Sequence, residues 1–530
     1  MIATRVARGE GARVRVLTSS DDVLPFLDDA AHYPGGHASA VYLPESEAEV
    51  AAVLRESARV TVSAAQSSLT GGATPQGGVV LSLTRMNRIR AWSEGTVRVE
   101  AGVVLSELDR ELRRRNLYYP PIPTYDGATV GGTVATNAAG AATFKYGSTR
   151  DWVEAITVVL VDGDVLELRR GQCVADDGRF ELACTSGRRI VVPLPSYRVP
   201  DVPKRSAGYH AAPGMDLVDL FIGSEGTLGV VTEIELRVLE GRPAWFCGLV
   251  PMANDDRALA LVAALRTASK ETWRAKDAHG IDVAAVEYLD RRCLELLSED
   301  HFDAQLGFSW PDDAGAALIF QAELPADATR DGAFSELEHL DDPSRDTRLL
   351  RICRLLVEHE VFDVTAPILP GETARRDALL KLREAVPAAV NRRIRERQRE
   401  IDPSISKSGG DVIVPFERIG ESLRVYREIL ARRGLDHAIW GHISDGNFHP
   451  NVLPASREQM VAAKEAQLEI GRAAIALGGC PLSEHGVGRN PVKQALLREL
   501  YGESGIGQMR AVKRALDPSG KLAPGVLFGE

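Results

Sequence analysis

The chain has 530 residues and a formal net charge of −11, with 44% hydrophobic and 26% charged residues. A single hydrophobic core rarely serves so long a chain, so several domains are expected. The acidic balance argues against a general nucleic-acid binder, because a wide basic surface needs an excess of Lys and Arg.

The chain shows no targeting or redox signature. The first residues contain arginines but no apolar core of a signal peptide, and no apolar run reaches the ~20 residues that span a bilayer. The six cysteines lie far apart, without a C-x-x-C pair, which indicates neither a zinc ribbon nor an iron–sulfur cluster. A reduced, cytoplasmic setting is therefore expected.

Residues 1–240 alternate glycine-rich turns with short β-rich runs such as ITVVLVDGDVLEL. Four of the glycine-rich segments also carry small hydroxyl residues, and their backbone N–H groups suit the binding of a pyrophosphate. These segments are AAQSSLTGGATPQGG (64–78), PPIPTYDGATVGGTVATNAAG (120–140), KYGSTRD (145–151) and FIGSEGTLGVVTE (221–233). Each alone is also consistent with an ordinary turn, and none fits the G-x-G-x-x-G of a nicotinamide cofactor site.

From Gly241 longer helical patterns appear, such as RRDALLKLREAVPAAVNRRIRER, between strand candidates such as AALIFQAEL and HAIWGHI. This pattern predicts an α+β domain in which helices cover a sheet. The arginine-rich stretch NRRIRERQRE is expected to be a solvated helix face, with an anion-steering patch as an open alternative.

The stretch GHISDGNFH, residues 441–449, carries two histidines around an Asp-Gly pair that is typical of a type I′ hairpin turn. With Asp445 and Gly446 as the central residues, His442 pairs directly with His449, and both imidazoles face the same side of the sheet. The pair is consistent with two metal ligands and equally with a polar cross-strand pair.

In this order, the glycine-rich segments resemble FAD-linked oxidases of the vanillyl-alcohol oxidase/p-cresol methylhydroxylase (PCMH) superfamily. The similarity is to the branch that contains D-lactate dehydrogenases, glycolate oxidase flavoprotein subunits and D-2-hydroxyglutarate dehydrogenases, and it extends from about Pro44 to Gly525. It implies an α+β chain with a two-part PCMH-type FAD-binding domain over residues 1–240. A substrate domain with an antiparallel sheet is expected over residues 241–475, and a C-terminal segment, 476–530, is expected to return to the FAD-binding domain.

The resemblance implies FAD, and the first segment contains no histidine or cysteine for a covalent flavin link. The family usually has glycines where this chain has Ala64, Ala65 and Gln66, and alanine fits there only if its φ is negative. The residues assigned to the cofactor are Ser67, Ser68, Leu69, Thr70, Gly71, Gly72, Thr129, Gly131, Gly132, Thr136, Asn137, Gly140, Tyr146, Gly147, Glu225, Gly226, Val230 and Asn447.

Two later motifs resemble the catalytic part of the family. The family's G-H-x-G-D-G-N-x-H matches residues 441–449, with Ser444 in place of a glycine, and its E-H-G-x-G matches residues 484–488. The resemblance implies His442, His449 and Glu484 as ligands of a divalent metal, zinc or manganese. It also implies His485 as the catalytic base.

Arg383 stands where the family's L-R-E motif binds the substrate carboxylate, a role that suits a bidentate guanidinium. Pro387 replaces a threonine that contacts substrate in the hydroxyglutarate enzymes, and Lys407 is not a clean match for the family's substrate lysine. Both departures weaken the similarity to the hydroxyglutarate enzymes in particular.

The implied reaction is the metal-assisted oxidation of a D-2-hydroxy acid to the 2-oxo acid, with the C2 hydride passing to flavin N5. The substrate would be D-lactate-like, glycolate-like or D-2-hydroxyglutarate-like, and a quinone, cytochrome or electron-transfer flavoprotein would accept the electrons. Two alternatives stay open: an electron-transfer subunit active only with a partner, and a redox-neutral enzyme similar to alkylglycerone-phosphate synthase. Peripheral association with the inner face of a membrane and a homodimer are also compatible with the sequence.

Overall fold

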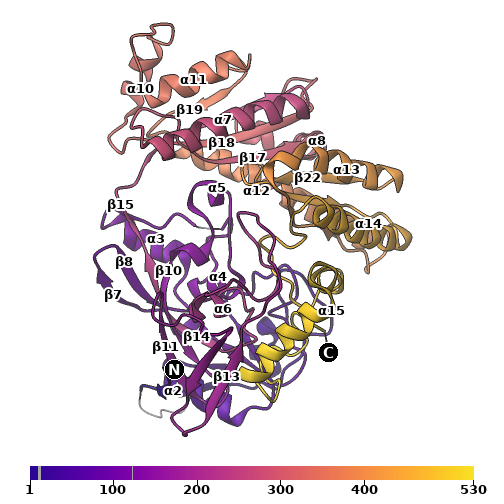
Figure 1. The fold of residues 1–530 in the computed structure, drawn as a ribbon. Helices are drawn as coiled ribbons and strands as arrows, with labels where there is room; N and C mark the ends of the chain where they lie inside the picture. The colour runs from indigo at the N-terminus through magenta and orange to yellow at the C-terminus, as the bar shows by residue number, and fades with distance from the viewer. Residues whose placement is uncertain (10–13, 122, 530) are drawn as a thin grey trace. The chain divides into compact units, whose positions relative to one another are not determined.

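The computed structural model describes residues 1–9, 14–121 and 123–529, and the chain divides into two compact units (Figure 1). Unit 1 contains residues 1–140, 147–240 and 480–530, and unit 2 contains residues 141–146 and 241–479. Ile122, in the second glycine-rich segment, lies outside the described residues. Unit 1 therefore combines the N-terminal β-rich region with the C-terminal end of the chain.

Unit 1 is built on two larger sheets and two smaller ones. The antiparallel six-stranded sheet has the order β2 (Arg5–Val6), β11 (Asp164–Arg169), β10 (Val153–Val159), β14 (Val230–Arg237), β8 (Thr96–Glu100) and β7 (Ile89–Ser93). The four-stranded sheet has the order β3 (Arg15–Leu17), β4 (Ala40–Leu43), β6 (Val79–Ser82) and β5 (Val60–Ser63), with β4, β6 and β5 parallel. The smaller sheets are β1 (Ile2–Ala3), β12 (Arg179–Ala183) and β13 (Arg189–Pro193), and β15 (Leu239–Glu240) with β9 (Leu117–Tyr118).

Unit 1 also contains several helices, most of them short. They are α1 (Ser20–Val23), α2 (Glu47–Glu56), α3 (Leu105–Arg113), α4 (Val130–Thr136), α6 (Leu217–Phe221) and α15 (Pro491–Leu516), with 3-10 turns η1 (Leu24–Phe26), η2 (Leu83–Arg85) and η3 (Thr149–Trp152). Helix α2 begins after Ser46, whose hydroxyl accepts a hydrogen bond from the Glu49 N–H, as is usual at a helix start. Its buried face, including Val50 and Leu54, then packs inside unit 1.

The C-terminal residues of unit 1 extend the four-stranded sheet. The Val60 N–H donates to the Lys521 carbonyl at 2.8 Å, and the Ala523 N–H donates to the Val60 carbonyl at 2.8 Å. Helix α15 starts at Pro491 behind Asn490, whose side chain accepts from the Val492 N–H, and it is kinked at Gly502, where φ is 66°. Residues 484–489, just before α15, are therefore held within unit 1.

Unit 2 contains one antiparallel sheet. Its order is β19 (Ala366–Ile368), β16 (Ala244–Met252), β18 (Ala316–Leu324), β17 (Val283–Asp290), β22 (His437–Gly441), β23 (Asn447–Val452) and β20 (Ser408–Gly409), and β21 (Val412–Ile413) also pairs with β23. Strand β18 is buried along its whole length, because it lies between β16 and β17 and helices cover the sheet.

Helices pack on both faces of this sheet (Figure 1). One core includes residues of α7 (Asp255–Ala275), α11 (Arg348–Glu358), α13 (Ile419–Arg432) and α14 (Arg457–Ala476), and the other includes residues of α8 (Arg291–Glu299) and α12 (Thr373–Glu400). The remaining helices are α5 (Thr143–Tyr146), α9 (Phe302–Gln305), α10 (Arg330–Leu337) and the 3-10 turn η4 (Phe416–Arg418). Among the described residues, no helix combines the length and apolar character needed to cross a bilayer.

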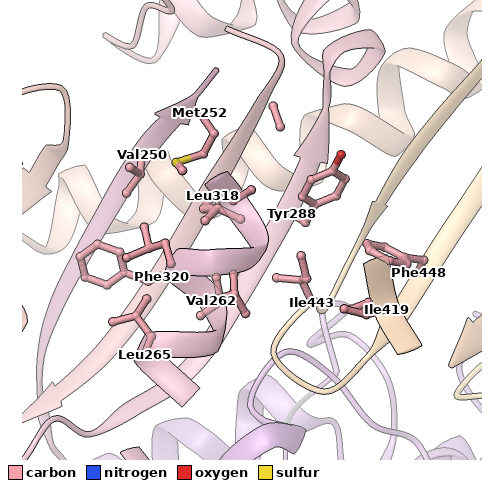
Figure 2. Close-up of a cluster of buried hydrophobic side chains, with 14 of the residues drawn as sticks. Val250, Met252, Val262, Leu265, Tyr288, Leu318, Phe320, Ile419, Ile443 and Phe448 are labelled. Carbon is pink, nitrogen blue, oxygen red and sulfur yellow. The ribbon is translucent and has the colours of Figure 1, made fainter. Parts of the chain in front are cut away.

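The first core anchors the histidine-bearing hairpin. Figure 2 shows Ile443 and Phe448 among apolar side chains of β16, β17, β18 and α7. Side chains alternate between the two faces of a strand, so Phe448 in this core turns its neighbour His449 toward the opposite face. Trp440, the direct partner of His449 in the ladder, belongs to the second core.

Residues 141–146 lie inside the range expected for the FAD-binding domain, yet they pack with unit 2. Lys145 Nζ lies 2.8 Å from Asp282 Oδ1 and 2.6 Å from Glu323 Oε2. The Tyr146 hydroxyl donates to Glu323 Oε1 at 2.5 Å. These largely buried ionic contacts attach the short segment to β18 and its surroundings.

Candidate functional site

The first glycine-rich loop follows β5 and contacts the segment that precedes α15. The Arg489 N–H donates to the Thr70 carbonyl at 2.9 Å. Gly71 has a φ of 76°, and a Cβ there would lie 2.7 Å from the Tyr33 ring. Gly488 has a φ of 56°, and a Cβ there would lie 2.3 Å from the Thr70 carbonyl oxygen. Side chains larger than hydrogen are therefore disfavoured at both positions.

The second and fourth glycine-rich segments meet at α4. The Thr129 hydroxyl accepts from the Gly132 N–H at the start of this helix, and Asn137 ends it with a φ of 49°. Backbone hydrogen bonds join the Gly223 N–H to the Val134 carbonyl at 2.9 Å and the Glu225 N–H to the Ala135 carbonyl at 2.8 Å. The two segments, separated by about ninety residues in the chain, thus form one continuous structure.

The third segment joins the same cluster through residues 147–151. Asn137 Oδ1 accepts from the Arg150 N–H at 3.0 Å, and the Thr149 N–H donates to the Ala138 carbonyl at 3.1 Å. Gly147 belongs to unit 1, whereas Tyr146 belongs to unit 2. The structure therefore brings most of the expected FAD residues together in unit 1, with Tyr146 and Asn447 as the exceptions.

Glu225 links these segments to residues 486–488. Its two carboxylate oxygens accept hydrogen bonds from the Val487 and Gly488 N–H groups, both at 2.8 Å. Burial raises the pKa of Glu225 to about 7, although these two N–H donors act in the opposite direction. The backbone of Glu225 is left-handed, with a φ of 52°, which places the carboxylate against the C-terminal segment.

These loops fit a flavin nucleotide. A Cβ at Gly72 would lie 3.5 Å from Ser68 Oγ, 3.7 Å from Glu225 Oε2 and 3.8 Å from Gly488 Cα, so the first and fourth segments and the segment before α15 converge here. Such surfaces let backbone N–H groups approach an anion closely. Among Ala64, Ala65 and Gln66, where the family usually has glycines, only Gln66 has a positive φ, of 54°. Neither alanine has a positive φ, so both are compatible with this backbone. Ser67 and Leu69 are exposed.

The histidine hairpin differs from the predicted type I′ turn. Trp440 rather than His442 pairs with His449, residues 442–446 form the loop, and Gly446 but not Asp445 has a positive φ. The prediction of two central residues in the left-handed conformation was therefore wrong. The reason is tertiary, because Ser444 binds strand β17: its hydroxyl accepts from the Val286 N–H at 3.0 Å, and its N–H donates to the Val286 carbonyl at 3.3 Å.

The two imidazoles are nevertheless adjacent. Their ring centroids are 5.5 Å apart, their planes make an angle of 89°, and both side chains are buried. Asp411 Oδ1 lies 3.7 Å from His449 Nδ1. Asn447, also buried, donates from Nδ2 to the Val412 carbonyl at 2.9 Å and to Asp411 Oδ1 at 3.3 Å. Imidazole nitrogens and carboxylate oxygens form a donor set that suits zinc or manganese.

Glu287, on β17, lies between His442 and Arg383. Glu287 Oε1 is 2.5 Å from His442 Nδ1, and Arg383 Nε donates to Glu287 Oε2 at 3.1 Å. Burial by itself raises the pKa of Glu287, but the electrostatic attraction and the hydrogen bonds of His442 and Arg383 outweigh it and lower the pKa to about 2. An ionised carboxylate therefore holds a candidate metal ligand and the candidate substrate-binding arginine.

Glu484 and His485 lie in unit 1, so the candidate metal ligands come from both units. Lys204 Nζ donates to Glu484 Oε2 at 2.8 Å, and His485 Nε2 lies 3.6 Å from Glu484 Oε1. The Gly486 N–H donates to Ser206 Oγ at 2.9 Å and helps to hold this segment. Joint coordination of one metal by His442, His449 and Glu484 stays a prediction.

Sequence reasoning did not find Glu287, Lys204 or Asp411. Glu287 had one available signal, a charged residue inside the apolar strand VAAVEYLD, which usually requires a buried partner. The arginine-rich stretch of α12 is largely paired: Arg392 and Arg393 contact Asp300, and Arg397 contacts Asp436. These contacts support a structural role for that helix face.

Comparison with known proteins identifies the family. Residues 38–169 match the FAD binding domain model, and residues 253–527 match the model of the C-terminal domain of FAD linked oxidases, which covers more than half of the chain. The chain belongs to the FAD-linked oxidases. The expected resemblance, the mixed α+β fold with these two domain types and the assignment as an FAD-linked oxidoreductase are thereby confirmed.

This FAD-linked oxidase is similar in sequence to enzymes with three different names. It is 29% identical to glycolate oxidase subunit GlcD of Bacillus subtilis, covering 87% of this chain and 82% of the relative. It is 28% identical to a D-lactate dehydrogenase of Anaerostipes hadrus (94% and 91% covered) and 27% identical to a D-2-hydroxyglutarate dehydrogenase of Xanthomonas citri (92% and 89% covered). A solved alkyldihydroxyacetonephosphate synthase matches with a TM-score of 0.59 and 14% identity over 96% of this chain and 82% of that one, which shows the fold alone.

Proposed function

We propose that this FAD-linked oxidase oxidises a D-2-hydroxy acid to the 2-oxo acid with the help of a divalent metal, zinc or manganese. The observation that carries the proposal is the buried Glu287, which contacts both His442 and Arg383. A candidate metal ligand and a candidate carboxylate-binding side chain thus share one buried carboxylate. The names of the relatives support a hydroxy acid as the substrate class.

The glycine-rich loops of unit 1 would hold non-covalent FAD, which supplies the hydride acceptor when bound. Because Gly71, Gly72 and Gly488 have no side chain, the cofactor's phosphates could approach the backbone closely there. The N–H groups of Val487 and Gly488 are already used by Glu225. Other N–H groups of the first loop are therefore the candidates for phosphate contacts.

The substrate would be held by its carboxylate and its hydroxyl. Arg383 would offer its two Nη groups to the carboxylate while Nε donates to Glu287. His442, His449 and Glu484 would hold a metal that lowers the pKa of the substrate hydroxyl. His485, with a quarter of its side chain exposed, would take the hydroxyl proton at Nε2 or Nδ1.

Small hydroxy acids are the first substrates to test. Pro387 lies on α12 one turn after Arg383 and offers no hydroxyl to a second carboxylate. D-lactate and glycolate therefore rank before D-2-hydroxyglutarate. A quinone, a cytochrome or an electron-transfer flavoprotein would reoxidise the flavin.

The deciding experiment is an anaerobic titration of purified protein, loaded with FAD and zinc or manganese, with D- and L-2-hydroxy acids. Loss of the visible flavin absorption with one enantiomer of one acid would establish dehydrogenation, the substrate and its handedness. Persistence of the oxidised spectrum with every acid, in protein shown to contain both FAD and metal, would contradict the proposal. Retesting in the presence of co-purified proteins would then reveal a partner-dependent subunit.

A further inference from the structure

Glu287 has an unusual position for a carboxylate. It lies in the middle of β17, a central strand between β18 and β22, and is 4% exposed. A buried charge is strongly unfavourable unless it is paired and hydrogen-bonded. Its two partners, His442 and Arg383, come from the histidine loop and from α12, elements that are far apart in the sequence.

Each oxygen of Glu287 serves one partner. Oε1 lies 2.5 Å from His442 Nδ1, and Oε2 accepts from Arg383 Nε at 3.1 Å. When a carboxylate accepts from Nδ1–H, the imidazole is held as the tautomer whose Nε2 lone pair can bind a metal. The same carboxylate holds the guanidinium through Nε, and because the guanidinium is planar and rigid this contact restricts how its Nη groups can be presented.

We propose that Glu287 is a positioning residue that couples metal binding to substrate binding, by setting the tautomer of His442 and the orientation of Arg383 with one carboxylate. This inference rests on the proposed function. His449 differs from His442, because its neighbouring carboxylate, Asp411, is 3.7 Å from Nδ1, beyond hydrogen-bond distance. Replacing Glu287 is therefore expected to weaken metal binding more than replacing Asp411.

The test variant is Glu287→Gln, which preserves the size of the side chain. Its amide has only one acceptor oxygen, so the amide NH₂ would face either His442 Nδ1 or Arg383 Nε, which both need an acceptor. The matched control is Asp290→Asn. Asp290 lies on the same strand, is also 4% exposed, and accepts hydrogen bonds from the N–H groups of Cys293 and Ile439 rather than from site residues. A merely structural role for Glu287 predicts the same behaviour for both variants.

The measurement is the zinc affinity of full-length, FAD-loaded, metal-stripped protein without substrate, by competition with a chromogenic chelator. We expect Glu287→Gln to weaken zinc binding about 10–100-fold and Asp290→Asn to leave it unchanged. In steady-state kinetics at saturating zinc, both Glu287→Gln and Arg383→Lys are expected to raise KM, whereas Arg383→Lys should not alter zinc affinity.

The outcomes separate the two proposals. If the wild-type protein binds zinc and Glu287→Gln binds it equally well, the positioning role is refuted and the proposed function stands. If the wild-type protein binds no zinc or manganese, the metal-assisted function and this inference both fail.

A second measurement needs no stable variant at position 287. In metal-free wild-type protein labelled with ¹⁵N-histidine at pH 8, His442, assigned by loss of its signals in His442→Ala, should carry its proton on Nδ1. A neutral His442 protonated on Nε2 would overturn the inference, even if Glu287→Gln does not fold.

Discussion

Lys204 donates a hydrogen bond from Nζ to Glu484 Oε2 at 2.8 Å, and the Lys204 side chain has no exposed surface. Both residues belong to unit 1, and Glu484 is itself only 10% exposed at its side chain. The candidate metal ligand therefore has one oxygen engaged by a buried ammonium group. Removing one partner of such a pair leaves an uncompensated buried charge.

We expect Lys204→Met to lower the free energy of unfolding of the metal-free protein by about 3–5 kcal/mol, because Glu484 loses its counter-charge. Urea denaturation of Lys204→Met, Glu484→Gln and the double variant completes a double-mutant cycle. The double variant should lose less than the sum of the two single losses. Simple additivity would mean that the two groups do not interact in solution.

Gly488→Ala should lower the FAD content of the purified protein. The new Cβ would lie 2.3 Å from the Thr70 carbonyl oxygen and would separate the first glycine-rich loop from residues 486–489. Gly214→Ala is the matched control, because its φ of 64° is similar but a Cβ there meets no atom within 4 Å. Both variants carry the left-handed strain of about 1–2 kcal/mol, so equal FAD content in the two would contradict the expected steric effect.

His442→Ala should abolish metal-dependent turnover and leave FAD bound, because most of the candidate FAD residues lie in unit 1 and His442 lies in unit 2. Turnover with and without added zinc and the flavin-to-protein absorbance ratio measure the two effects. His437→Ala, on strand β22 of the same hairpin, serves as the control. Wild-type activity in His442→Ala would eliminate this histidine as a ligand.

Arg383→Ala should raise KM steeply, corresponding to about 2–5 kcal/mol of lost binding if it pairs with the substrate carboxylate in a buried site. The variant also removes a partner of Glu287, so unfolding by urea must be measured alongside the kinetics. A normal KM in a stably folded variant would place the carboxylate site elsewhere.

The buried histidine His210 is expected to lower the free energy of unfolding as the pH falls below about 6.5. Burial, followed by the positive charges of Arg150 and Arg205, lowers the pKa of His210 to about 3. The native state keeps this histidine neutral while the unfolded chain protonates near pH 6.5, so the free energy of unfolding falls as pH drops below about 6.5. His210→Gln should show a shallower loss between pH 7.5 and 5, by up to about 1.4 kcal/mol per pH unit. Identical pH profiles would exclude this contribution.

The family, the FAD-binding domain type and the change in sequence pattern near Gly241 could be predicted from the sequence, because they depend on local features. Glycine patterns and short motifs such as G-S-E-G-T-L-G are contiguous, and strand and helix periodicities are read over a few residues. The adjacency of His442 and His449 was likewise foreseeable, since a short hairpin brings its two strands together.

The register of that hairpin was decided by tertiary contacts, because Ser444 bonds to Val286 on β17, more than 150 residues earlier in the chain. The contacts of Glu287 with Arg383 and of Lys204 with Glu484 also join residues distant in sequence, and no local pattern pairs them. The packing of residues 141–146 with unit 2 arises in the same way, from the contacts of Lys145 with Asp282 and Glu323. Local chemistry thus determined which residues are candidates for binding FAD, a metal or a carboxylate, whereas burial and long-range charge pairing, which exist only in the folded chain, decided what holds them in place.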